Sequence, residues 1–178
     1  MNVCIFCSSK SDLSQETFDE AKKISHFLAE NSHGFVYGGG AVGLMGFFAD
    51  QIVSLGGTSI GVIPEGAFEQ EVAHQGLTEL IYTKDMLDRK RVMMERSDAF
   101  VIFPGGIGTM DEALEVLTWK TIYKFDKPII FFNIDGFWDP FLQMLKAYEK
   151  TGLFYPETMR AFKVVDNMND LIGEMHRA

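Results

Sequence analysis

The sequence FVIFPGGIGTMDE, from Phe100 to Glu112, passes from an apolar run through a glycine cluster into a segment of helical character. The apolar run is strand-sized, and acidic residues stand where the first turn of the next helix is expected. A strand that feeds a glycine loop brings backbone N–H groups close to an anion, and the following helix adds unpaired donors and the positive end of its dipole. The stretch therefore predicts a phosphate cradle beside a carboxylate, in an α/β fold.

Glu112 also has a purely local interpretation, as part of a helix cap. Thr109-x-x-Glu112 has the spacing of a capping box, in which the threonine oxygen accepts from the N–H near the glutamate and the glutamate reaches back. For an arbitrary sequence this local role is the commoner one. Both interpretations stay open on these residues alone.

Length and composition fit one domain that spans residues 1–178. A chain of 178 residues can bury most of its apolar surface in a single core. Its net charge of −9 argues against nucleic-acid and anionic-membrane partners, because both favour a basic patch. Its apolar runs are far shorter than a membrane span, and residues 1–7 read as a first strand rather than a leader. We therefore expect a cytoplasmic protein without a membrane segment.

The cysteines and histidines give no sign of redox or metal chemistry. Cys4 and Cys7 are spaced as C-x-x-C, but three positions along a strand point side chains to opposite faces, and a redox motif belongs at a helix start. The histidines lack the spacing of metal ligands; they are His26, His33, His74 and His176. We expect neither a metal site nor a redox pair.

Strand-like and helical runs alternate along the chain, which predicts a doubly wound, Rossmann-like parallel sheet. Strands are expected at residues 3–7, 35–37, 58–63, 79–82, 100–103, 129–132 and 163–165. Helices are expected at residues 14–30, 44–55, 86–96, 110–123, 138–150 and from about 169. The stretch 64–78 is longer than an ordinary connection and suggests a binding loop. In such sheets ligands bind at the carboxyl ends of the strands, near the point where strand order reverses.

A second glycine loop, YGGGAVGLMG in residues 37–46, follows an earlier strand. Its Gly38, Gly40 and Gly43 match the dinucleotide fingerprint G-x-G-x-x-G. That fingerprint also needs an acid at the end of the next strand, and residues 58–63 offer none. A dinucleotide oxidoreductase is therefore disfavoured. Two glycine loops on one edge fit a mononucleotide better, with one loop on its phosphate and the other near the sugar or base.

Arg89 and Glu112 are the residues whose side-chain chemistry indicates a reaction. Arg89 stands at the start of an expected helix, where its charge opposes the dipole; an anionic ligand would explain this position, and so would an exposed salt bridge. A guanidinium binds phosphate oxygens in a fork, and a carboxylate stabilises positive charge on a sugar when its bond to a base breaks. The pair predicts nucleotide hydrolysis. Glu71 is a candidate second acid, with a solvated loop glutamate as the alternative.

Two motifs together resemble a known family. PGGIGTMDE, in residues 104–112, matches P-G-G-x-G-T-x-x-E, and Met86-Leu87-Asp88-Arg89-Lys90 is similar to the companion element M-H-x-R-K. They occur in the LOG family, the cytokinin riboside 5′-monophosphate phosphoribohydrolases, whose first glycine loop resembles residues 37–46. The resemblance extends from the first strand to the helix after Trp138.

The resemblance implies cleavage of N6-modified adenosine 5′-monophosphates, and often AMP, to free base and ribose 5-phosphate without a metal or organic cofactor. It also implies a homodimer, with the helix that bears Arg89 near the subunit contact. Arg89 and Glu112 correspond to the catalytic pair. The positions that resemble nucleotide contacts are Gly39, Gly40, Glu71, Lys90, Gly106, Ile107, Gly108, Thr109, Met110, Asp111 and Thr118. Members have often been labelled lysine decarboxylases, but a pyridoxal enzyme needs a Schiff-base lysine in a much larger framework.

The chain departs from the family pattern at two positions, where Leu87 replaces a usual histidine and Asp88 a frequent glutamate or glutamine. Loss of a ring donor would alter affinity or base preference, while Arg89 and Glu112 remain. The sequence therefore predicts a phosphoribohydrolase without choosing between adenine and an N6-substituted adenine. A nucleotide-binding or sensing module that does not cleave its ligand is the alternative, because it would share the phosphate loops.

Overall fold

The computed structural model describes residues 1–66, 73–155 and 157–176. This part of the chain forms a parallel sheet in the order β4-β3-β2-β1-β5-β6-β7. Its strands are β1 (Asn2–Phe6), β2 (Gly34–Tyr37), β3 (Ser59–Pro64), β4 (Glu79–Thr83), β5 (Ala99–Ile102), β6 (Ile129–Phe132) and β7 (Lys163–Val165). The predicted doubly wound α/β sheet is confirmed.

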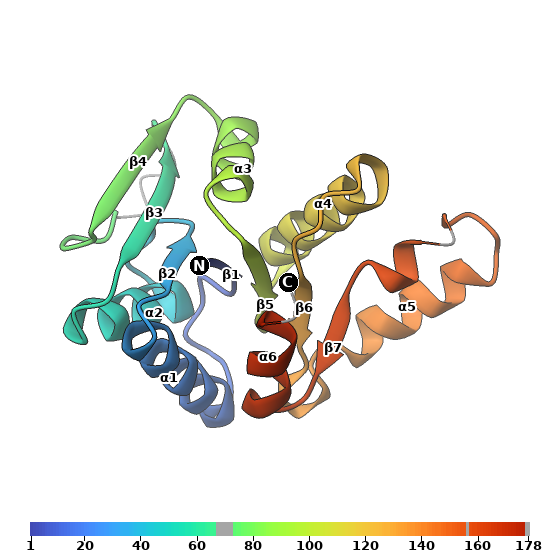
Figure 1. Ribbon diagram of the computed structural model, residues 1–178, viewed down its shortest axis with the longest axis horizontal. Helices are drawn as coiled ribbons and strands as arrows, with labels where there is room; N and C mark the ends of the chain where they lie inside the picture. Colours follow the sequence, from blue (N-terminus) through green and yellow to red (C-terminus); the bar gives the residue numbers. More distant parts are fainter. Residues whose placement is uncertain (67–72, 156, 177–178) are drawn as a thin grey trace.

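Helices connect the strands and cover the sheet (Figure 1). They are α1 (Gln15–Glu30), α2 (Gly43–Ser54), α3 (Met86–Glu95), α4 (Ile107–Tyr123), α5 (Asp139–Glu149) and α6 (Met168–Met175), with short 3-10 turns η1 (Ile134–Gly136) and η2 (Thr158–Arg160). Each helix begins within a residue of its expected start except α4, which begins at Ile107 rather than at residue 110. None of the helices in the described ranges is both long and apolar enough to cross a bilayer.

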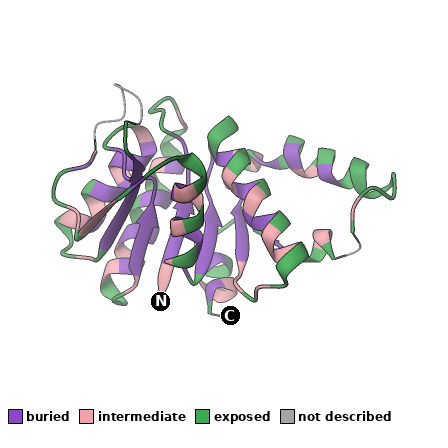
Figure 2. Cartoon of the chain, turned by 90° about the horizontal axis from the view of Figure 1, so that it is seen from above, coloured by how far each residue is buried: buried purple, intermediate pink, exposed green. Residues whose placement is uncertain are grey.

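A layer of helices covers each face of the sheet, and each layer packs against the sheet around a separate hydrophobic core. Helices α1, α2 and α6 lie on one face, and α3, α4 and α5 on the other (Figure 1). Successive side chains of β1 separate accordingly, since Val3 and Ile5 enter the first core while Cys4 and Phe6 enter the second. Because both faces are covered, the central strands are buried throughout (Figure 2), which is why they read as unbroken apolar runs.

The strand order reverses at β1, which pairs with β2 on one side and with β5 on the other. The chain builds β1 to β4 outward in one direction and then crosses back to β5. The loops that leave the carboxyl ends of these central strands therefore meet at one edge, and the N–H of Ser8 donates to Pro104 O across it (3.2 Å). Both glycine loops lie at this edge, where ligands of doubly wound sheets bind.

His33 lies in the turn between α1 and β2, and its Nε2 is buried with no hydrogen-bond partner among the described residues. Its ring packs edge-on against Phe27, and its centroid is 6.3 Å from that of His176. Burial, the N-terminal ammonium group and His176 lower the pKa of His33 below its ordinary value of 6.5. The folded protein therefore keeps this imidazole neutral at pH values where the unfolded chain begins to protonate it.

Lowering the pH through 6.5 should reduce the free energy of unfolding, because the unfolded chain takes up this proton more readily than the folded protein. Urea unfolding of His33→Phe should show a smaller loss between about pH 7.5 and pH 5.5 than the wild type. His26→Gln, which removes a histidine from the surface of α1, should retain the wild-type loss. An unchanged loss in His33→Phe would contradict this assignment.

Candidate active site

Arg89 of α3 and Glu112 of α4 face each other at the carboxyl edge of the sheet. Arg89 Nη1 and Glu112 Oε1 are 3.7 Å apart, and the two side chains are only 7% and 13% exposed. Because both side chains are largely shielded from water, their opposite charges attract each other more strongly than an exposed pair would. The structure thus brings together the two residues that the sequence singled out for catalysis.

Backbone carbonyl groups hold the guanidinium of Arg89. Its Nε donates to Val62 O of β3 and its Nη2 to Gly38 O at the end of β2, both at 3.0 Å. Its Nη1 faces Glu112 and lies 3.9 Å from Met86 Sδ. The alternative of an exposed, salt-bridged arginine is therefore wrong, because Arg89 is buried. Nε and Nη2 thus fix the guanidinium to the backbone, and Nη1 is directed to Glu112.

The start of α3 explains how an arginine comes to lie here. Asp85 caps the helix, and its carboxylate accepts from the N–H of Asp88 at 2.7 Å. On the outer face Arg91 forms ion pairs with Asp88 and Glu95. The acidic residues of the first turn offset the unfavourable position of a cation near the helix N-terminus. Arg89 can then point inward to the sheet.

Thr109 does not cap α4. The helix begins at Ile107 with Gly106 as its N-cap, and no side chain of the described residues caps it. Thr109 is buried in the first turn, where its Oγ1 donates to Cys7 O, just after β1, at 3.0 Å. The capping-box interpretation of Glu112 is therefore wrong, and its carboxylate faces Arg89 instead. Thr109 ties the start of α4 to the strand where the sheet order reverses.

The glycines at the start of α4 leave open space in front of the helix. A Cβ added to Gly106 or Gly108 would meet no described atom within 4 Å, and both glycines are exposed, as is Ile107 between them. The hydrogen-bond ladder of the helix starts with the N–H of Met110, which donates to Gly106 O at 3.0 Å. The N–H groups of the first turn therefore point to the open end of the helix dipole. This is the geometry that a phosphate cradle requires.

The helix that follows the first glycine loop has no such opening. At the start of α2 the N–H groups of Leu44 and Met45 donate to Lys10 O and Ser8 O, both at 3.3 Å. A Cβ on Gly43 would stand 2.3 Å from the backbone of the same β1–α1 loop. Protein thus occupies the N-terminus of α2, whereas the N-terminus of α4 is open.

Gly39 and Gly40 border the edge of the sheet after β2. The carbonyl of Gly39 accepts from the N–H of His74 at 3.0 Å, and Gly40 forms an antiparallel bridge with Ala73. Gly39 has a φ of +80°, a conformation that favours glycine. These contacts of Gly39 and Gly40 therefore fix residues 73 and 74, just before the chain enters β4. Glu71 lies outside the described residues.

Lys90 joins α3 to α4 on the side of the Arg89 pair. Its Nζ lies 3.0 Å from Asp111 Oδ2 and also contacts Glu115. Burial pushes the pKa of Lys90 down, but hydrogen bonds to Glu115 and Asp111 outweigh this effect and hold the pKa above its ordinary value. Lys90 is therefore a charged group that links two helices.

Two predicted contact residues point away from the ion pair. Thr118 Oγ1 donates to Leu114 O within α4 (2.7 Å), and its side chain lines an apolar groove of about 200 Å³ together with Leu153 and Phe154. Met110 packs against the second core. Within one chain the structure does not bring these two side chains to the ion pair.

The cysteines lie on opposite faces of the sheet, as predicted. Cys4 packs in the second core and Cys7 in the first, and both are free. Burial, and after it the charge of Glu112, raises the pKa of each thiol well above the ordinary value, so neither is a thiolate near neutral pH. In the described ranges no three His, Cys, Asp or Glu side chains gather as metal ligands.

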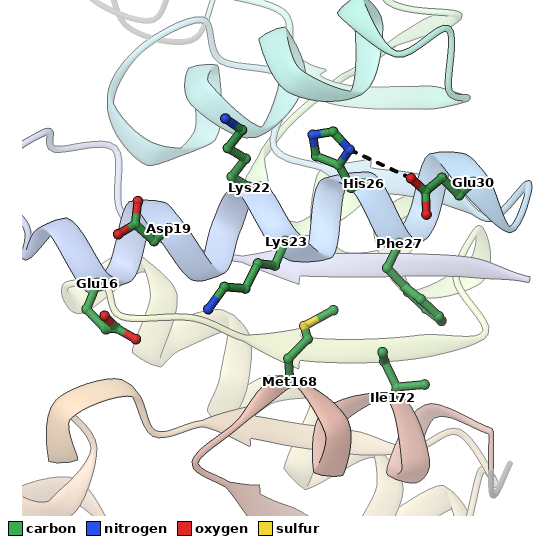
Figure 3. Close-up of a pocket in the computed structure, with 9 residues that line it drawn as sticks. All are labelled: Glu16, Asp19, Lys22, Lys23, His26, Phe27, Glu30, Met168 and Ile172. Atoms are coloured by element: carbon green, nitrogen blue, oxygen red, sulfur yellow. Dashed lines mark ion pairs between the residues drawn. The ribbon is translucent and has the colours of Figure 1, made fainter.

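A broader groove of about 560 Å³ lies between α1 and α6 (Figure 3). Phe27, Met168 and Ile172 supply its apolar surface, and charges of both signs surround them. His26 and Glu30 of α1 pair with each other at 3.9 Å. Neither member of the buried ion pair borders this groove, so its size alone does not make it the candidate site.

Comparison with known proteins identifies the family. The family described as "Possible lysine decarboxylase" matches residues 45–175. The chain is 32% identical over 173 residues to cytokinin riboside 5′-monophosphate phosphoribohydrolase LOG5 of Arabidopsis thaliana, covering 97% of this chain and 76% of LOG5. The chain belongs to the LOG family. Its identity to LOG2 of the same plant is 37% over 170 residues, with 96% and 80% covered.

Solved structures of other proteins share the fold of this LOG-family chain. The molybdenum cofactor binding protein from Rippkaea orientalis superposes with a TM-score of 0.73 at 17% identity, over 99% of this chain and 95% of the other. The molybdenum cofactor carrier protein from Chlamydomonas reinhardtii gives 0.72 at 19% identity, over 99% and 96%. At such identities the likeness shows the fold alone.

Sequence reasoning missed three parts of this LOG-family site. Val62 and Gly38 hold Arg89 through their carbonyl groups, and backbone acceptors leave no trace in a side-chain pattern. Glu115 pairs with Lys90, and here a signal existed, because Asp111 and Glu115 are four residues apart on one helical face.

Thr109→Val should lower the free energy of unfolding by about 1–2 kcal/mol, because the buried carbonyl of Cys7 loses its donor while the side chain keeps its shape. Urea unfolding would measure this change. Thr118→Val is the matched control, since it removes an exposed hydroxyl that bonds only within its own helix, and should cost less than about 0.5 kcal/mol. Equal costs for the two variants would contradict the tie between α4 and β1.

Proposed function

We propose that this protein hydrolyses the N-glycosidic bond of adenosine 5′-monophosphate or an N6-modified derivative, releasing the free base and ribose 5-phosphate. One observation carries the proposal: a buried ion pair of Arg89 and Glu112, 3.7 Å apart, lies at the same edge as the open N-terminus of α4. Its relatives' names support the reaction, since they are cytokinin riboside 5′-monophosphate phosphoribohydrolases.

The first turn of α4 would bind the 5′-phosphate. Its N–H groups face open space, and the absence of side chains at Gly106 and Gly108 lets phosphate oxygens approach the backbone. Ile107, Thr109, Met110 and Asp111 complete this segment, and Lys90 adds a cation beside it. A protein with a net charge of −9 needs such a local arrangement to hold a dianion.

Glu112 would act on the sugar. Cleavage of the bond between C1′ and the base nitrogen leaves positive charge on the ribose, and an ionised carboxylate close to C1′ stabilises that charge. A water molecule then adds its hydroxyl to C1′ and its proton ends on the base. Arg89 fixes the direction of the Glu112 carboxylate through Nη1, which also contacts Met86 Sδ. This chemistry requires no redox group or electron sink.

The family description as a lysine decarboxylase finds no support at this site. A lysine that forms a Schiff base with a cofactor must lose its proton readily. Lys90 is held charged between Asp111 and Glu115, with its pKa above the ordinary value. Its arrangement suits anion binding and helix pairing.

The remaining contacts are assigned to the base and ribose. Gly39 and Gly40 border the edge of the sheet beside the pair, and Glu71 keeps the nucleotide contact that the family resemblance implies for it. Thr118 would reach a nucleotide only across a subunit contact, because it lines the outer groove of α4. Leu87, which is 71% exposed at the start of α3, replaces a polar ring and would shift the preference toward a less polar base.

We also propose a cytoplasmic homodimer that uses the outer surface of α4. Leu114, Ile122 and Tyr123 on this helix are exposed, as are Leu153 and Tyr155 nearby in the same groove. A concentration of apolar side chains of this kind marks an interaction surface. Two free, buried thiols suit a reducing compartment.

Glu112→Gln should release base from AMP at least about a hundredfold more slowly than the wild type while still binding the nucleotide, because only the charge that supports C1′ is removed. Chromatography of free adenine, with calorimetry for binding, would measure both. Glu95→Gln, which neutralises an exposed carboxylate of α3, should keep the wild-type rate. Nucleotide binding without base release in the wild type would favour the non-catalytic binding module, and equal rates for the variant and wild type would remove Glu112 from catalysis.

Light scattering should give the wild type a mass of about 40 kDa, twice the 20.1 kDa of one chain. Ile122→Glu should shift the population toward the monomer, since it places a charge in the apolar surface of α4. Leu55→Glu alters another exposed apolar residue, at the end of α2 on the opposite face of the sheet, and should leave the dimer intact. A monomeric wild type would contradict the proposed assembly.

A further inference from the structure

Gly38, at the end of β2, lies directly against the guanidinium of Arg89. A Cβ built on Gly38 would stand 1.9 Å from Arg89 Nη2 and 3.1 Å from its Cζ, well inside the 3.4 Å of an ordinary contact. Gly38 is not among the residues of positive φ, so its backbone conformation does not itself require glycine. The space taken by Arg89 is what excludes a side chain here.

We infer that Gly38 is a positioning residue for the reaction: the absence of its side chain opens the slot in which Arg89 is held toward Glu112. The inference rests on the proposed function. The carbonyl of Gly38 accepts from Nη2 at 3.0 Å, so this residue supplies both the space and one of the two backbone acceptors that orient the guanidinium. Nη1 is thereby directed to Glu112 at 3.7 Å.

The glycines of the two loops divide into two kinds by what a side chain would meet. At Gly105 a Cβ would stand 2.1 Å from Thr109 Oγ1, so this glycine, like Gly38, makes room for a functional side chain of the protein. At Gly106 and Gly108 a Cβ would meet nothing within 4 Å among the described residues, so these two leave space for a ligand. The glycine motif at the start of α4 therefore contains a position that makes room for a protein side chain, as well as positions that leave space for a ligand.

Replacing Gly38 with alanine should displace Arg89 rather than unfold the protein. The clashing atoms are the far end of a flexible side chain rather than backbone, so the side chain shifts and the backbone after β2 stays in place. To restore an ordinary contact the guanidinium must move by more than 1 Å, and its bonds to the two carbonyls must then break or lengthen. Misplacement of a catalytic group by about 1 Å can cost about a hundredfold in rate.

The test is steady-state hydrolysis of AMP by Gly38→Ala. We expect kcat to fall at least about tenfold, with KM within about threefold because the cradle of α4 is untouched, and with a native circular dichroism spectrum. Gly173→Ala is the matched control, since it adds the same methyl group in α6 where nothing lies within 4 Å, and it should keep the wild-type kcat. A wild-type kcat in Gly38→Ala would overturn the inference.

A double-mutant cycle with Arg89→Lys identifies the cause. A lysine has no atom at the place of Nη2, so Gly38→Ala should cost less than about twofold in kcat in the Arg89→Lys background. The urea midpoint gives the same cycle without activity: Gly38→Ala should lower it in the wild-type background and not in the Arg89→Lys background. Additive effects in the midpoint cycle would overturn the inference. A wild type that releases no base would instead overturn the proposed function, while the midpoint cycle would still decide whether Gly38 forms the slot.

Discussion

A buried guanidinium persists in a folded protein only when its N–H groups are bonded and its charge is paired. Arg89 meets this condition with a carbonyl from β3, a carbonyl from the end of β2 and the carboxylate of Glu112 on α4. Two strands and two helices are therefore tied to one side chain. Because removing any partner would leave a buried polar group unsatisfied, this cluster constrains both the geometry of the site and the packing around it.

The topology of the sheet brings the N-terminus of α4 to the same edge as this cluster. The order reverses at β1, so the loops after β1, β2 and β5 converge, and the side chain of Thr109 fastens the start of α4 to the end of β1. The β1–α1 loop fills the N-terminus of α2, while the N-terminus of α4 faces open space. At the N-terminus of α4 the backbone dipole favours an anion, while Arg89 and Lys90 offset the nearby carboxylates of Glu112, Asp111 and Glu115.

Much of this arrangement could be predicted from the sequence, because the periodicity of apolar residues and the positions of glycines are local properties. The strands of the described sheet, the two glycine loops and the pairing of Arg89 with Glu112 all followed from apolar runs, glycines and the order of two motifs. The start of α4 did not, because Thr109 and Glu112 satisfy the spacing of a cap equally well. Only the tertiary partners, Cys7 O for one and Arg89 for the other, decide between the two interpretations.

What the sequence could not give was the set of contacts between backbone and side chain. The carbonyl acceptors of Arg89 are invisible in residue types, and the reason for glycine at position 38 appears only when a neighbouring helix is in place. Likewise Gly43 matched a dinucleotide fingerprint, yet it packs against protein. Glycines therefore allow close packing in both loops, whereas Gly106 and Gly108 at the start of α4 leave open space.

A crystal structure of Glu112→Gln with AMP would test the central claim most directly. We expect the phosphate on the N–H groups of residues 107–109, at the N-terminus of α4, with C1′ of the ribose next to the side chain of residue 112 and Arg89 Nη1 on the same side. A phosphate bound at α2 or in the groove between α1 and α6, with residue 112 remote from the sugar, would contradict it.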